Sequence, residues 1–201
     1  MIVVCGLASY LNFKKFNKNS FPSLSFENLL KTEAPQNSED SLFPEKEGEK
    51  EWLSPDGKLK LRYSQSWIEY DKILLEELKQ NATSSLESEI LLYAIRIKEE
   101  GKAFCFLTVE KINSKKNLEE IIGMLKKNSK EEFEIVDSQN EENSANLEFN
   151  TRIEEKTDFH SKMKMFFTED KTYLITVSAP ENDFEKFAEE SSILSSAEFI
   201  D

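Results

Sequence analysis

Apolar and polar residues alternate along much of the chain, a pattern that is typical of half-buried β-strands. The alternation first becomes regular at residues 59–63. Two later runs, 90–97 and 103–112, are apolar at most positions, so we expect both of their faces to be covered. The turn-forming residues 99–102 between them favour a hairpin. Further strands are predicted over residues 133–136, 145–154, 160–168 and 172–179, with a polar loop at 137–144.

Other segments carry apolar residues at helical spacing. The clearest one has an inner stripe of Leu118, Ile121, Ile122 and Leu125. Asn117 and Glu120 predict a capping box at its start. Asn182 and Glu185 predict a second capping box, for a closing helix with the inner stripe Phe184, Phe187, Ala188 and Ser191. A short helix is also expected over residues 71–80.

Strands outnumber helices in this pattern, and the short turns between them favour antiparallel pairing. Two good helices are enough to cover the two faces of one sheet. We therefore predict an α+β fold, in the form of an α/β/α sandwich with a mainly antiparallel sheet covered by helices on both faces.

Composition divides the chain into three parts. Residues 1–13 are nearly all apolar and predict a membrane anchor. Residues 14–51 are polar, acidic and interrupted by prolines, which predicts a flexible stalk. Its one apolar island is Phe21, Leu24, Phe26, Leu29 and Leu30. Residues 52–201 form the predicted folded domain.

The apolar start is short for a membrane span. As a helix, thirteen residues reach about 20 Å, whereas a bilayer core of about 30 Å needs roughly 20 residues. We therefore expect Met1 to lie inside a longer membrane segment or to be a misassigned start. The alternative is that residues 1–13 pack as a buried terminal element.

Charge argues against one class of partner. The chain has a formal net charge of −13, and residues 52–201 carry −11 of it. Nucleic-acid binding requires a cationic surface, so we predict no nucleic-acid partner.

The apolar start is followed by three cations, Lys14, Lys15 and Lys18. The positive-inside rule would place that side of the membrane segment in the cytoplasm unless further cations precede the segment.

Residues suited to catalysis are scarce. His160 is the single histidine, and a Cys–His or Ser–His–Asp site would have to use it. Cys105 lies within an apolar strand, where a thiol usually belongs to the core, and Cys5 lies in the apolar start. A zinc site cannot be built from one histidine and two distant cysteines. We therefore predict no catalytic residue, no metal site, no cofactor and no enzymatic activity.

Carboxylates and aromatic residues leave alternatives open. The adjacent acids along the chain lack the spacing of a calcium loop and are expected to be solvated. Trp52 and Trp67 are candidates for a binding surface or for one end of the core. The domain has one basic cluster, suited to an acidic partner or to internal ion pairing, which consists of Asn150, Arg152, Lys162 and Lys164. Hairpin pairing of residues 145–154 with 160–168 is expected to place Arg152 near Lys162.

The order of elements resembles that of the PsbP-like family, which includes Mog-type proteins and bacterial membrane-anchored members of unknown role. The residues that carry the resemblance are the run 63–67, Tyr-Ser-Gln-Ser-Trp, and the run 172–180, which ends in Ala-Pro. A helix near Asp183 and an apolar end over residues 194–200 complete it. Ser64 departs from the proline that the family often has there. The resemblance spans about residues 52–200 and implies a scaffold or binding module without a catalytic centre.

We therefore predict a membrane-tethered, non-enzymatic protein-interaction or assembly module of bacterial type, with its domain outside the cytoplasm and a protein partner. One alternative is a carboxylate-based ligand-binding or hydrolytic domain. Another is a soluble cytosolic adaptor without a membrane role.

Overall fold

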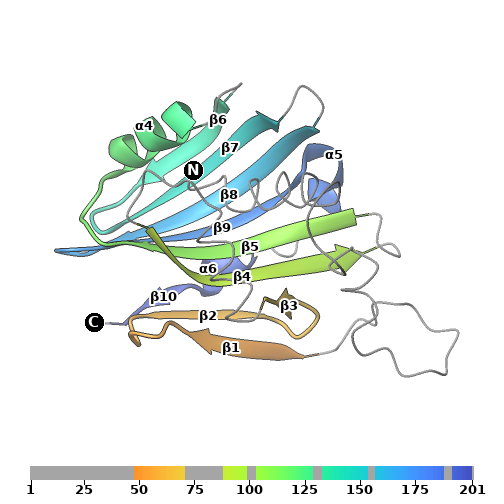
Figure 1. The fold of residues 1–201 in the computed structure, drawn as a ribbon, viewed down its shortest axis with the longest axis horizontal. Coiled ribbons are helices and arrows are strands. Elements are labelled where there is room, and N and C mark those ends of the chain that lie inside the picture. The colour runs from red at the N-terminus through yellow and green to blue at the C-terminus, as the bar shows by residue number, and fades with distance from the viewer. Residues whose placement is uncertain are drawn as a thin grey trace, which may run out of the picture.

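The computed structural model describes residues 48–70, 88–98, 103–128, 133–153, 157–187 and 192–200. Two antiparallel sheets dominate these residues (Figure 1). The predicted anchor 1–13, residues 14–47 of the predicted stalk 14–51, and the predicted helix 71–80 lie outside the described residues. Residues 49–51, which were predicted to belong to the stalk, are part of a β-strand. No helix in the described part of the chain has the length and apolar character required to cross a bilayer.

The large sheet has seven strands in the order β3-β4-β5-β9-β8-β7-β6, and all its neighbours are antiparallel. The strands are β3 (Ile68–Glu69), β4 (Ser88–Lys98), β5 (Ala103–Ile112), β6 (Phe133–Asn140), β7 (Ser144–Ile153), β8 (Thr157–Phe167) and β9 (Thr172–Pro180). The hairpins β4–β5 and β7–β8 confirm the strand pairings that the alternating runs predicted.

The small sheet has three strands in the order β1-β2-β10. They are β1 (Glu49–Leu53), β2 (Leu59–Ser64) and β10 (Glu198–Phe199). β1 and β2 are joined by a tight turn in which Gly57 has a φ of +72°, a conformation that glycine adopts without steric cost. The pairing of β10 with β2 brings the end of the described chain back to its beginning.

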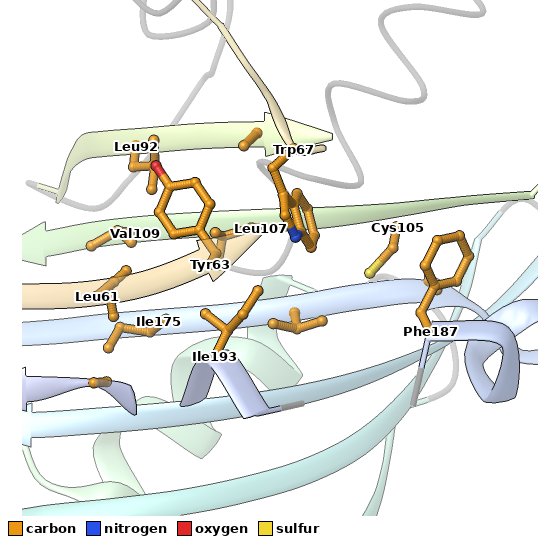
Figure 2. Close-up of a cluster of buried hydrophobic side chains, with 14 of the residues drawn as sticks. Leu61, Tyr63, Trp67, Leu92, Cys105, Leu107, Val109, Ile175, Phe187 and Ile193 are labelled. Carbon is orange, nitrogen blue, oxygen red and sulfur yellow. The ribbon is translucent and has the colours of Figure 1, made fainter. Parts of the chain in front are cut away.

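The small sheet packs on one face of the large one, and the two bury a common core. Figure 2 shows Leu61, Tyr63 and Trp67 against Leu107 and Ile175. The helix α6 (Ser192–Ser196) adds Ile193 to this core, and Phe184 of α5 (Glu181–Phe184) also joins it. Trp67 is 2% exposed, so it closes the core and offers no binding surface.

The other face of the large sheet carries the helix α4 (Leu118–Asn128) and a second apolar cluster. Ile121 and Leu125 of the predicted helical stripe are buried in it. The capping box is confirmed, because the Asn117 amide donates to Glu120 Oε2 at 3.0 Å and the Glu120 amide donates to Asn117 Oδ1 at 2.9 Å.

The predicted α/β/α sandwich is wrong. Among the described residues, a three-stranded sheet with the short helices α5 and α6 beside it lies where the second helical layer was expected. The physical reason is that β2 buries Leu59, Leu61 and Tyr63 along one face, so a sheet supplies the apolar surface that a long helix would otherwise provide.

Two smaller predictions are also wrong. The second capping box is absent, because α5 has Pro180 at its N-cap without a side-chain hydrogen bond, and Asn182 lies inside its first turn. The predicted loop 137–144 is strand as far as Asn140, since β6 continues along β7.

Candidate interaction surface

β6 forms one edge of the large sheet and pairs with β7 on its inner side. All its residues from Glu134 to Asn140 are exposed. An edge strand directs about half of its backbone N–H and C=O groups away from its neighbour. Within the part of the chain that the structure describes, no strand pairs with these outer groups.

A β-bulge shapes this edge. Ile135 pairs with Phe149 and Asp137 pairs with Glu148, so Val136 has no opposite residue on β7. Val136 is 51% exposed and Ile135 is 36% exposed, which makes them two of the few large apolar side chains at the described surface. Bulges bend a strand and redirect its side chains. Here the bulge exposes Val136 in the middle of the edge.

Both ends of the edge are held in place. At the start of β6, the ring of Phe133 stacks on Phe149 with centroids 5.2 Å apart. At its end, the Glu141 amide donates to the Ser144 carbonyl at 2.8 Å, and the Ser144 hydroxyl donates to Glu141 Oε2 at 2.7 Å. The turn into β7 is therefore closed, and β6 presents a defined eight-residue strand.

The side chains of β7 and β8 beside this edge form a hydrogen-bonded polar surface. His160 Nδ1 lies 2.7 Å from Asn150 Oδ1, and His160 Nε2 lies 2.9 Å from Glu148 Oε1. Lys162 forms an ion pair with the other Glu148 oxygen at 3.5 Å. The His160 ring also meets Phe184 edge-on at 4.2 Å, so this cluster holds α5 against β8.

The predicted basic cluster is paired internally. Arg152 lies opposite Asp158 and bonds it at 2.8 Å, so it is not beside Lys162 as expected. Lys164 donates to the Ala197 carbonyl at 3.2 Å, and burial lowers the pKa of its ammonium group. With Lys162 bound to Glu148, these cations connect parts of the fold and do not form an open site for an acidic partner.

A Cys–His pair is not formed. Cys105 is buried on β5, and β9 separates it from His160 on β8. Two strand spacings place the two residues about 10 Å apart. Among the described residues, no group of three or more His, Cys, Asp and Glu side chains could hold a metal ion.

One buried carboxyl group was missed by the sequence interpretation. Glu110 of β5 is 1% exposed, and neither carboxyl oxygen has a hydrogen-bond partner. Burial raises its pKa to about 8. The alternation of β5 could have revealed Glu110, because every second residue from Phe106 to Ile112 points to the α4 side of the sheet.

Comparison with known proteins gives similarities of structure alone. No protein-family model and no curated protein sequence matches the chain. The cyanobacterial PsbP of Synechocystis matches with a TM-score of 0.49 at 12% identity, over 83% of this chain and 100% of that one. LpqN of Mycobacterium tuberculosis, described as involved in cell envelope biogenesis, matches with a TM-score of 0.48 at 6% identity, over 90% and 100%.

Proposed function

We propose that this chain is a non-enzymatic protein-interaction module that binds an extended segment of its partner along β6. The observation that carries the proposal is the edge itself, with exposed residues from Glu134 to Asn140 and the apolar Ile135 and Val136 at its centre. An added strand gains main-chain hydrogen bonds from such an edge, while side chains on alternate positions give specificity.

Site-specific photo-crosslinking in the cells that make the protein tests this proposal. A crosslinker at Ser138 on β6 is expected to capture one defined partner, whereas a crosslinker at Glu169, in the exposed turn after β8, is not. Val136→Pro introduces a residue that disturbs strand pairing and should abolish the capture. Equal capture from Ser138 and Glu169, or capture that persists in a folded Val136→Pro variant, would contradict the proposal.

Membrane tethering through residues 1–13, with the domain outside the cytoplasm, belongs to the same proposal and is supported by their apolar sequence. Deleting residues 1–13 should move the protein from the membrane fraction to the soluble fraction. In a Cys5→Ser background, Ser38→Cys should react with an impermeant thiol reagent in intact cells. A soluble full-length chain would favour the cytosolic adaptor instead, and labelling only after lysis would contradict the external location.

A ligand-binding function has one observation in its favour, which is the buried carboxyl group of Glu110. Buried carboxyl groups with strongly raised pKa values are enriched at functional sites. Native mass spectrometry of the purified full-length protein tests this alternative. The ligand-binding alternative requires that the wild-type protein carry a bound small molecule that is absent from the Glu110→Gln variant. A wild-type mass equal to that of the chain alone would exclude this alternative.

A further inference from the structure

The edge of β6 is strongly acidic. Residues 133–144, which comprise β6 and the turn that follows, contain the four acids Glu134, Asp137, Glu141 and Glu142 and no Lys or Arg. All four are exposed. The edge is therefore uniformly negative, and a strand that binds to it must carry compensating positive charge.

The acids have a defined position on the strand. Glu134 pairs with Asn150 and Asp137 pairs with Glu148, so both lie on the side of the sheet that carries the His160 cluster. Asp137 therefore faces another carboxylate across the strand pair, an arrangement that is unfavourable. The charge of Glu148 is compensated by its ion pair with Lys162, and its other oxygen lies 2.9 Å from His160 Nε2.

Glu134 and Asp137 are not compensated in this way. Among the described residues neither forms an ion pair, and the Asp137 carboxylate accepts only from the Ser138 amide at 2.8 Å and Gln139 Nε2 at 3.4 Å. Glu134 and Asp137 therefore lie on one side of an open edge without cationic partners. A strand added to this edge could supply the cations.

The other side of the same edge is apolar. Ile135 pairs with Phe149, which is buried in the cluster beneath α4, and Phe133 stacks on that ring. A strand added outside β6 would place alternate side chains on these two sides. Its cations would face Glu134 and Asp137, and its apolar residues would extend the cluster beyond Ile135.

We infer that the segment bound by β6 is a cationic amphipathic strand, in which Lys or Arg alternates with branched apolar residues. This inference rests on the proposed function and identifies the partner chemistry. A second copy of this chain fits less well, because each copy has a net charge of −13 and brings the same acidic edge to the contact.

Binding of two matched peptides to the full-length protein tests the inference. The probe is a capped peptide of about eight residues that alternates Lys with Val, and its control replaces each Lys with Glu. Affinity is measured by fluorescence anisotropy, and the bound strand is located by hydrogen exchange of the β6 amides. We expect the Lys–Val peptide to bind on the order of tenfold more tightly at low salt and to protect β6.

Charge reversal supplies the matched variants. Glu134→Lys with Asp137→Lys should weaken Lys–Val binding by about tenfold and strengthen Glu–Val binding. Glu169→Lys with Glu185→Lys makes the same change of charge at exposed positions away from β6 and should leave both affinities near the wild-type values. If the charge-reversal variant does not fold, the neutral double variant Glu134→Gln with Asp137→Asn replaces it. The neutral variant should change the two affinities in the same direction, but by less.

Three results would overturn the inference in different ways. If the two peptides bind with equal affinity and both protect β6, the preference for a cationic strand is wrong, but strand addition at β6 still holds. Absence of β6 protection by either peptide overturns the inference together with β6 as the binding edge. Equal weakening by the distant and the β6 charge reversals shows that general charge attraction alone is responsible, and it also overturns the inference.

Discussion

Tyr173 of β9 donates a 2.7 Å hydrogen bond to Oδ2 of Asp56, which lies 117 residues earlier in the turn between β1 and β2. Lys111 of β5 lies 3.7 Å from the same oxygen, and Ser54 donates to the other oxygen at 2.7 Å. Partial burial acts to raise the pKa of Asp56, but the hydrogen bonds from Ser54, Tyr173 and the Lys58 amide and the charge of Lys111 outweigh it and lower the pKa to about 2. The Asp56 carboxylate therefore connects the small sheet to the large one through its contacts with Tyr173 and Lys111.

Replacing Tyr173 with Phe should lower the free energy of unfolding by about 1–2 kcal/mol at neutral pH, since a hydrogen bond to a carboxylate is lost. Chemical denaturation measures the change. Asp56→Ala and the double variant complete a mutant cycle, and a coupling energy near zero would show that the contact does not connect the sheets. The acid-unfolding midpoint should also rise in Tyr173→Phe, because the Asp56 pKa moves back toward its ordinary value.

Glu110→Gln should change how stability depends on pH. The folded pKa of about 8 is above the ordinary value of 4.5, so between these values the folded chain keeps a proton that the unfolded chain releases. The wild-type free energy of unfolding should therefore fall as pH rises from about 5 to 8, by on the order of a few kcal/mol. Glu110→Gln lacks this titration and should melt several degrees above wild type at pH 8, but close to it at pH 5.

Thermal melts across that pH range check the prediction, with Glu169→Gln as an exposed control that should follow the wild-type curve. Other titrating groups are common to both proteins, so the difference between the curves isolates Glu110. Parallel wild-type and Glu110→Gln curves would show that Glu110 does not hold its proton in the folded chain.

Local patterns predicted the elements whose residues interact with near neighbours in the sequence. The capping box of α4 and the β7–β8 hairpin are examples, because both depend on short-range periodicity. The alternation over residues 59–63 predicted β2, but the small sheet that β2 forms with β1 and β10 could not be predicted in this way. It pairs Glu198 with Lys60 and Phe199 with Leu59, and two-residue strands that join distant segments leave no period in the sequence.

The candidate surface was missed for a related reason. β6 beyond Asp137 has neither face buried, so its side chains show no alternation and read as a loop. The basic cluster was found in the sequence, but its charges depend on cross-strand register. Arg152 meets Asp158 and Lys162 meets Glu148, and the register that selects these partners is fixed by the hairpin turn and the buried face.

Asn117→Ala should lower the free energy of unfolding by about 1 kcal/mol, because the Glu120 amide loses its capping acceptor. Asn117→Asp retains an acceptor and adds a favourable charge at the helix start, so its stability should equal or exceed that of wild type. Urea denaturation distinguishes the variants. Equal losses in both would mean that the side chain of Asn117 acts through something other than the cap.

Removal of residues 1–46 should leave a folded domain. The described fold begins at Gly48, whose carbonyl accepts a 3.0 Å hydrogen bond from the Gln65 amide, and β1 follows at Glu49. A chain starting at Glu51 would instead lose the first two residues of β1, including Lys50, which forms an ion pair with Glu69. We therefore expect the chain starting at Glu47 to melt within a few degrees of full length, and the chain starting at Glu51 to melt lower.

Removal of residues 1–46 would instead destabilise the domain if the apolar island packed on it. The island consists of Phe21, Leu24, Phe26, Leu29 and Leu30 and lies outside the described residues. Burial of two such side chains would contribute roughly 3–6 kcal/mol before the entropy of ordering. Because about 1 kcal/mol shifts the melting temperature of a domain of this size by roughly 2–4 °C, docking of the island would be readily measured. A fall of about ten degrees on removing residues 1–46, reversed by adding back residues 20–46, would make the island part of the fold and contradict the stalk.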